Sequence, residues 1–253
     1  MKKHVLMVLI LAASAASGFA QGFDWQPSPR RPYKAPRNFI GLELGIGRGS
    51  HTGSLPYLEV DVPNACCTYE SGTSLPMRIA LVGESWIAPT RALGFDLSLQ
   101  LQSVSFAAAQ QELPRVGRGP LVTRYELDVK TSYLAIGASV RQRLGSSMVV
   151  ASAGVRSAFL LSASMTNREV VIGPAEDTFA DGQRVLTLPT EGLADAASVF
   201  IEPNVSIGYD LPLSVGTYIE PSVNFGYSLS TLSSSHSWKY FWFGLGVRLM
   251  KGR

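Results

Sequence analysis

Hydrophobic and polar residues alternate along most of the chain from residue 38 onward. In segment 93–103, for example, Leu97 and Leu99 face one way while Asp96 and Ser98 face the other. A period of two predicts β-strands, because successive side chains of a strand point to opposite faces. Eight segments carry the pattern, at residues 38–49, 74–87, 93–103, 127–144, 148–164, 198–211, 213–230 and 238–250. The sequence therefore predicts an all-β domain of eight strands.

The polar face of these strands consists mostly of Gly, Ser, Asn and Gln, with isolated charges. Charged residues make up 16% of the chain, below the quarter that is usual in soluble domains. A soluble sandwich would need a charged aqueous face. Small polar side chains instead fit the interior of a narrow barrel whose apolar face meets lipid. We therefore expect a closed antiparallel up-and-down transmembrane β-barrel rather than a sandwich.

The connections between the segments alternate in length. Long ones are expected at 50–73, 107–126, 165–197 and 231–237, and tight turns at 88–92, 145–147 and 212. Short periplasmic turns and longer extracellular loops are typical of outer-membrane barrels. An even number of strands then places both ends of the barrel segment in the periplasm.

Three local features modify this picture. The alternation within 127–144 changes phase near Tyr133, which predicts a bulge. Pro203 and Pro221 occupy equivalent places in a short repeat, and because proline has no N–H they predict bulges or weak pairing. Aromatic residues near strand ends are expected to form interfacial girdles. These are Tyr133, Tyr209, Tyr227, Trp238 and Tyr240.

Charged residues on the polar face would lie inside the barrel. They are Glu43, Arg78, Glu84, Asp96, Arg141, Arg156, Glu202, Glu220 and Arg248. Isolated buried charges are heavily penalised, so we expect acids and bases to pair. The sequence thus predicts a polar network that plugs the lumen. The alternative is a proton or ion pathway through the same groups.

The first twenty residues have the features of a secretory signal peptide. Lys2 and Lys3 precede an apolar stretch at 5–13, and small residues lead up to Ala20. The apolar stretch is too short for a membrane-spanning helix. Residues 21–37 are rich in proline and basic residues, which indicates a periplasmic linker. The predicted organisation is therefore signal peptide 1–20, linker 21–37 and barrel 38–253.

The overall charge argues against a nucleic-acid partner. The chain has 22 Lys and Arg against 19 Asp and Glu, and without Lys2 and Lys3 the excess falls to one. Such a balance provides no electrostatic attraction for a polyanion.

Two small groups of residues could carry chemistry. Cys66 and Cys67 are adjacent, with Cα atoms about 3.8 Å apart, so a disulfide between them would be strained. For an exported chain we expect a vicinal disulfide or another structural role rather than metal or redox chemistry. His236 lies between Ser235 and Ser237, which would suit a lipid-A-modifying hydrolase if a carboxylate oriented the imidazole. Turn chemistry explains these serines equally well, so we expect no enzyme, metal or cofactor.

The last segment resembles the assembly signal of the small outer-membrane β-barrel family, of which the OmpA transmembrane domain and OmpX are familiar members. The residues that carry the likeness are Trp242, Gly244, Val247 and Leu249. The resemblance covers about 38–253. It implies residence in the outer membrane, with membrane lipids and the barrel assembly machinery as partners. The expected role is structural, or surface interaction through the loops, and the alternative is a narrow channel or transport accessory.

Overall fold

The computed structural model describes residues 36–56, 68–115, 119–145, 147–174, 176–179 and 181–253. Regular structure within these ranges is entirely β. The described residues include no helix that is long and apolar enough to cross a bilayer. The strands are β1 (Asn38–Pro56), β2 (Thr68–Ala88), β3 (Arg91–Ala107), β4 (Gln111–Leu113), β5 (Leu121–Arg143), β6 (Val149–Gly173), β7 (Val185–Thr187), β8 (Glu191–Gly192), β9 (Val199–Tyr209), β10 (Leu211–Ser214), β11 (Thr217–Tyr227) and β12 (Trp238–Gly252).

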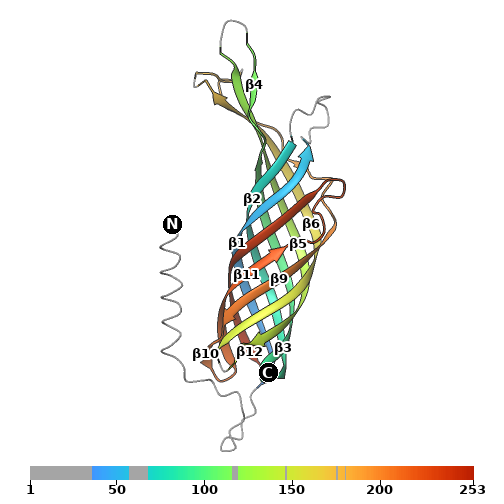
Figure 1. Cartoon of the computed structure of the whole chain (residues 1–253), viewed down its shortest axis with the longest axis vertical. Helices are drawn as coiled ribbons and strands as arrows, with labels where there is room; N and C mark the ends of the chain where they lie inside the picture. The colour runs from blue at the N-terminus through green and yellow to red at the C-terminus, as the bar shows by residue number, and fades with distance from the viewer. Residues whose placement is uncertain (1–35, 57–67, 116–118, 146, 175, 180) are drawn as a thin grey trace, which may run out of the picture.

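Eight long strands form a closed antiparallel ring. Their order is β1, β2, β3, β5, β6, β9, β11 and β12. The ring closes where β12 pairs with β1, from Phe39 opposite Gly252 to Gly53 opposite Trp238. Figure 1 shows these strands tilted around the barrel. The predicted up-and-down, eight-stranded barrel is confirmed.

The surface of the ring is apolar and its interior is polar. On β1 and β12, Leu42 and Leu249 are 59% and 50% exposed, whereas their inward-facing neighbours Glu43 and Arg248 are buried. A ring without edges satisfies its backbone hydrogen bonds internally, which a sheet in lipid must do. The exposed band therefore faces acyl chains, and the barrel is transmembrane.

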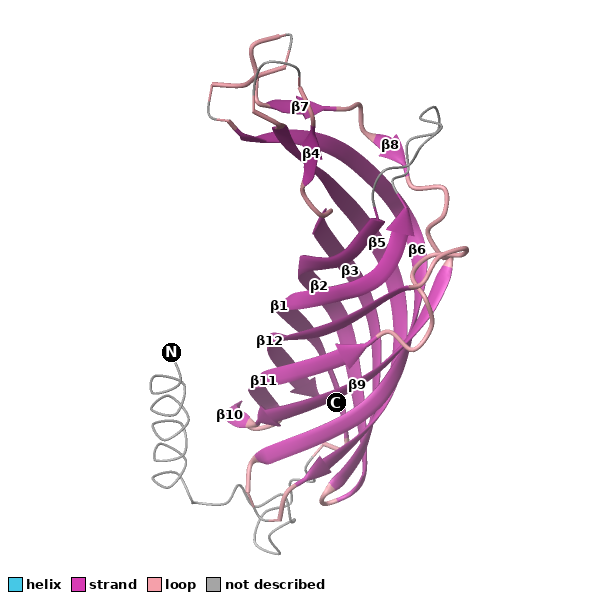
Figure 2. Cartoon of the chain, turned by 45° about the horizontal axis from the view of Figure 1, so that its top comes forward, coloured by secondary structure: helices cyan, strands magenta, loops and turns pink. Residues whose placement is uncertain are grey.

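The two ends of the barrel differ. At the turn end, short connections join β2 to β3 and β5 to β6, and the backbone of Arg253 donates to the carbonyl of Asn38 at 2.9 Å. At the loop end the strands reach beyond the apolar band. The short strands β4 and β7 pair there with β5 and β6, and β8 also pairs with β6. Figure 2 shows this extension projecting beyond the rest of the barrel.

The phase change near Tyr133 comes from a change in the surroundings of β5, and not from a bulge in that strand. In β5 the alternation is unbroken: Leu127 and Val129 point inward like Tyr133, and Asp128 points outward. The strand leaves the apolar band at this level, so the polarity of its two faces reverses. A register shift does occur opposite Ser132 and Tyr133, but the additional residue is Leu161 in β6. The bulge thus lies at the predicted height of the barrel, but it is in β6 and not in β5.

The tight turn predicted at 212 is also wrong. β9 ends at Tyr209, and β10 forms a hairpin with β11 whose turn lies at 215–216. Gly216 has a φ of 75°, a conformation that favours glycine. Leu213 and Val215 alternate with polar residues as barrel strands do, which explains the misplacement.

Pro203 and Pro221 delimit the pairing between β9 and β11. That ladder runs from Ser222 opposite Gly208 to Gly226 opposite Asn204 and stops beside each proline. Pairing between β11 and β12 is longer, from Thr217 opposite Lys251 to Tyr227 opposite Phe241. The weak pairing predicted from the prolines is therefore present at this seam.

Candidate functional site

All eight long strands contribute charged side chains to the barrel interior. The structure places the nine predicted lumen residues there, and eight of them are buried, while the Asp96 side chain is 12% exposed. The alternation puts them inside because each lies between two outward-facing positions, as Glu43 lies between Leu42 and Leu44. The interior is therefore lined by acids and bases at low dielectric.

These nine residues form one continuous set of ion pairs, which we call the lumen network. Toward the loop end, Arg156 contacts Glu202 at 3.1 Å and Asp96 at 3.2 Å. Arg78 lies 3.7 Å from Asp96 and also pairs with Glu43. A single connected chain therefore runs from β9 to β1 through the middle of the barrel.

The lumen network continues from Glu43 to the turn end. Arg248 contacts Glu43 at 2.6 Å and lies 3.9 Å from Glu220. Arg141 pairs with Glu220 and contacts Glu84 at 3.1 Å. Five carboxylates and four guanidinium groups thus leave one formal negative charge. Pairing offsets the cost of burying these groups, and removing one partner would expose that cost.

Tyrosines terminate the lumen network at both ends. The Tyr240 hydroxyl donates to Glu202, to which Trp242 Nε1 also donates at 3.0 Å. The Tyr218 hydroxyl donates to Glu84. Trp242 belongs to the predicted assembly signal and points inward with Gly244, while Val247 and Leu249 face outward.

One buried ion pair escaped the sequence analysis. Arg143 Nη2 contacts Asp210 at 2.8 Å, and the Arg143 guanidinium lies 4.6 Å from the centre of the Trp86 ring. Arg143 and Asp210 lie near the ends of predicted segments 127–144 and 198–211, with the same parity as Arg141 and Glu202, so the alternation places them on the polar face, but the predicted network left them out. Their separation of 67 residues also gave no local signal.

An apolar cluster, here the outer cluster, closes the lumen toward the loop end. It includes Tyr69, Phe106, Leu127, Leu232 and Trp238, which are all at most 2% exposed. Tyr133 and Tyr240 belong to the same cluster, so the prediction that Tyr133, Trp238 and Tyr240 form an interfacial girdle is wrong. The reason is that the interior becomes apolar where the strands leave the membrane.

His51 anchors the outer cluster through both ring nitrogens. Trp238 Nε1 donates to its Nδ1 at 3.0 Å, and its Nε2 lies 2.8 Å from Ser74 Oγ. Because the indole N–H can only donate, the proton of His51 resides on Nε2. The ring also stacks on Tyr240 at 5.4 Å.

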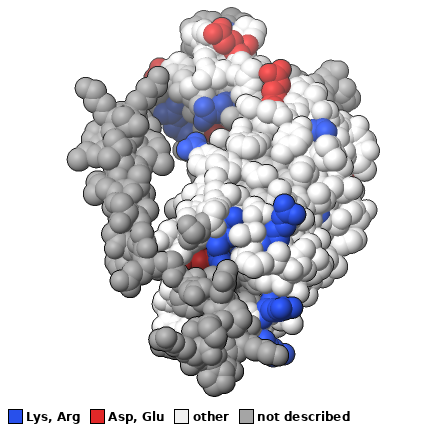
Figure 3. Space-filling model, turned by 60° about the horizontal axis from the view of Figure 1, so that its bottom comes forward, with Lys and Arg blue, Asp and Glu red and all other residues white. Residues whose placement is uncertain are grey.

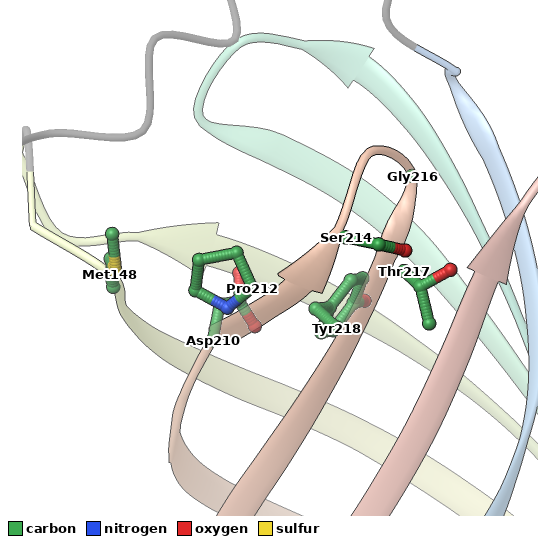
Figure 4. Close-up of a pocket in the computed structure, with 7 residues that line it drawn as sticks. All are labelled: Met148, Asp210, Pro212, Ser214, Gly216, Thr217 and Tyr218. Carbon is green, nitrogen blue, oxygen red and sulfur yellow. The ribbon is translucent and has the colours of Figure 1, made fainter.

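A smaller apolar cluster occupies the turn end, with Phe39, Tyr218 and Met250 as its largest members. Beside it, a small groove lies between Met148 and the β10–β11 hairpin. Figure 4 shows Pro212, Ser214 and Tyr218 along this groove, which also includes Asp210. Asp210, which lines the groove, is also the partner of Arg143.

A small cavity, with room for about one water molecule, lies beside the lumen network. Amide side chains of Gln100, Gln102 and Asn224 line it together with Arg78 and Trp242. Gly45 also lines it, and a Cβ placed there would meet no atom closer than 3.6 Å. The interior is thus not fully packed at this level.

The Ser-His segment lies in the loop between β11 and β12 and contacts Asp195. Asp195 accepts from Ser234 Oγ at 2.6 Å and from Ser235 Oγ at 2.7 Å, and also from Ser233. His236 Nδ1 lies 2.8 Å from Asp195 Oδ2. We call these five residues the loop clamp, because they join the β8–β9 and β11–β12 loops.

The loop clamp does not have the geometry of a catalytic triad. Ser235 Oγ lies 2.8 Å from His236 Nδ1, the same nitrogen that contacts Asp195. A triad needs serine and carboxylate on opposite ring nitrogens. Although partial burial acts to raise the pKa of Asp195, hydrogen bonds from the serines and His236 outweigh it and hold the pKa below its usual range. The clamp is therefore a carboxylate held by hydrogen bonds, and it contains Ser235 but not Ser237.

Other predicted features fall on residues that the structure does not describe. Cys66 and Cys67, the signal peptide 1–20 and nearly all of the linker 21–37 lie outside the described residues. Within the described ranges, no three His, Cys, Asp or Glu side chains are grouped so as to hold a metal ion.

Comparison with known proteins finds similarity in solved structures. No protein-family model and no curated protein matches the chain. The outer membrane protease OmpT of Escherichia coli is 9% identical, with a TM-score of 0.37, over 85% of this chain and 96% of that one. The attachment invasion locus protein Ail of Yersinia pestis is 8% identical, with a TM-score of 0.31, over 85% and 99%. Neisserial surface protein A is 15% identical, with a TM-score of 0.31, over 84% and 96%. The fold assignment rests on the strand pairing of the chain itself.

Proposed function

We propose that this chain is an exported integral outer-membrane protein without enzymatic activity. Its barrel acts as a closed anchor, and its loop end presents an interaction surface outside the cell. In this orientation the turn end faces the periplasm. The apolar band, the connection lengths and the signal-peptide features of residues 1–20 support the location. We further propose membrane lipids and the barrel assembly machinery as its partners.

The closure of the lumen is the observation that carries the proposed role. The outer cluster, the lumen network and the turn-end cluster obstruct the interior at three successive levels. Within the network, each of the four arginines contacts two carboxylates. Opening a path for ions would require separating several buried pairs together, which is costly.

The loop end supplies the surface that an anchor would display. β4, β5, β6 and β7 form a continuous sheet beyond the apolar band. Arg168 contacts Asp128 at 2.6 Å on its outer face. Exposed apolar side chains also lie there, including Leu113, Ile172 and Leu186. A rigid sheet with mixed polar and apolar groups suits binding of a surface ligand.

The second candidate is a narrow channel, which the small polar cavity beside the lumen network favours. Conductance of the purified barrel in planar bilayers separates the two functions. The anchor function predicts a silent bilayer at neutral pH. Discrete, ion-selective openings of the wild-type protein would contradict it and support the channel.

The absence of enzymatic activity has its own test. Lipid deacylation by the wild-type barrel should equal that of the Ser235→Ala and His236→Ala variants and of protein-free vesicles. Deacylation that both substitutions abolish would overturn this part of the proposal.

A further inference from the structure

The turn end of the barrel carries exposed basic residues without acidic partners. They are Arg37, Arg91, Lys251 and Arg253, which we call the basic rim. None of the four forms an ion pair with any residue in the described ranges. Arg91 donates instead to the neutral side chain of Gln142 at 2.9 Å. Figure 3 views the molecule from this end and shows its basic side chains in blue.

The acidic side chains of the described residues at this end are turned inward. Among the described residues near the turns, Glu84, Asp210 and Glu220 are buried and paired with arginines. The loop end is different, because exposed carboxylates occur there. They include Glu70, Glu112, Glu176, Asp181 and Glu191. The barrel therefore has a charge asymmetry, because exposed acidic side chains occur at the loop end and none occurs among the described residues of the turn end.

Two residues of the basic rim lie directly below the lipid-facing surface. Lys251 continues the outward row of Val247 and Leu249 on β12. Arg91 begins β3, whose outward row continues with Leu93 and Phe95. Long basic side chains at such a boundary extend their stems along apolar surface and place the charge among headgroups. Their charges therefore lie at the level of lipid phosphates, beside the barrel rather than beneath it.

We propose that the basic rim binds the headgroups of anionic phospholipids in the periplasmic leaflet. Lys251 and Arg91 lie on the outer side of the barrel wall, where lipid headgroups are adjacent. The cell wall would have to approach from the periplasmic end of the barrel, so this placement favours a lipid. Each basic residue near an anionic surface strengthens binding about fivefold. The inference rests on the proposed outer-membrane location and adds the lipid class to it.

Native mass spectrometry of the folded full chain in detergent tests the proposal. Phosphatidylglycerol and phosphatidylcholine are titrated separately, and their binding constants are compared. The wild type should prefer phosphatidylglycerol. Lys251→Gln should weaken that binding about fivefold and the double variant Arg91→Gln/Lys251→Gln about 25-fold. The matched control Arg48→Gln/Lys130→Gln removes two exposed cations near the loop end and should leave phosphatidylglycerol binding unchanged.

Three results would overturn the proposal. In the first, the wild type binds the two lipids equally, and in the second, the control variant loses as much phosphatidylglycerol binding as the double variant. In the third, the double variant keeps its lipid binding but no longer cosediments with purified peptidoglycan. Gel mobility before and after boiling is recorded for every variant. A folded barrel that binds the anionic and the zwitterionic lipid equally refutes this inference alone. A chain that never folds in detergent refutes the proposed function.

Discussion

Arg248 and Glu43 stand directly opposite each other across the seam where the barrel closes, with Arg248 Nε 2.6 Å from Glu43 Oε2. Glu43 belongs to the first strand and Arg248 to the last. Arg248 also lies 3.9 Å from Glu220 on β11, and Glu43 pairs with Arg78 on β2. The lumen network is therefore complete only when the ring is closed.

Removing one arginine from the lumen network should destabilise the barrel strongly. Arg141→Met leaves Glu84 buried without a cation and leaves Glu220 with only the more distant Arg248, at 3.9 Å. Loss of one partner of a buried ion pair costs about 3–5 kcal/mol. We expect this decrease in the free energy of unfolding, measured by urea titration in lipid vesicles.

Two further variants identify the cause of that loss. Arg124→Met removes a half-buried pair with Glu126 on the outer face and should cost less than about 1 kcal/mol. Arg141→Met combined with Glu84→Gln and Glu220→Gln removes the unpaired charges and should recover most of the stability. Equal costs for Arg141→Met and Arg124→Met would refute a stabilising network.

Two lumen glycines should respond oppositely to alanine. Gly137 lies opposite both Asp96 and Arg156, and a Cβ there would meet the Asp96 carboxylate and lie 2.9 Å from Arg156 Cγ. Gly137→Ala should therefore lower the free energy of unfolding by about 1–3 kcal/mol. Gly45→Ala adds its Cβ to the cavity and should be neutral or stabilising by about 0.5–1 kcal/mol. The same urea titration compares them, and a larger loss at Gly45 would contradict the cavity.

The hydrogen bond within the outer cluster can be removed by a smaller aromatic side chain, which also leaves a cavity. Trp238→Phe deletes the indole N–H that reaches His51 Nδ1, leaving a buried acceptor unpaired. This should cost about 1–3 kcal/mol. Combining it with His51→Phe removes the acceptor too, so the double variant should lose less than the sum of the single variants. Strict additivity in a double-mutant cycle would show that the bond contributes nothing.

The loop clamp should persist to unusually low pH. Because hydrogen bonds hold the pKa of Asp195 below its usual value, the stability it contributes is present above about pH 3.9, the ordinary value, and is lost only as pH falls through the lower folded-state pKa. Amide-exchange protection of residues 193–198 and 231–237 should therefore survive at pH 4. Asp195→Asn should lower that protection at all pH values between 4 and 7. Wild-type protection that disappears between pH 7 and pH 5 would contradict the clamp.

The fold could be predicted because a strand that crosses lipid has one apolar and one polar face. The alternation of residues therefore shows which way each side chain points. Leu42, Leu99 and Phe225 had to face one solvent along the whole apolar band, so the eight transmembrane strands and the nine residues of the lumen network followed from alternation. Pairing within the network was not predictable. Arg141 contacts Glu220 across 79 residues, and the tilt and register of closed strands decide such contacts.

Prediction failed where the surroundings change from lipid to water. Above the band the interior is apolar, so Val129 is buried, whereas Leu99 within the band faces lipid. The lengths of β5 and β6 and the buried positions of Trp238 and Tyr240 were therefore missed. The loop clamp also escaped, because Asp195 approaches His236 from another loop 41 residues away.

Electrophoretic mobility of the membrane-extracted full chain, with and without boiling, tests the barrel most directly. Closed transmembrane barrels retain their structure in sodium dodecyl sulfate until heated. The account predicts sedimentation with outer membranes and an unheated band that migrates differently from the boiled one. Recovery of the chain in the soluble fraction, with identical migration before and after boiling, would contradict it.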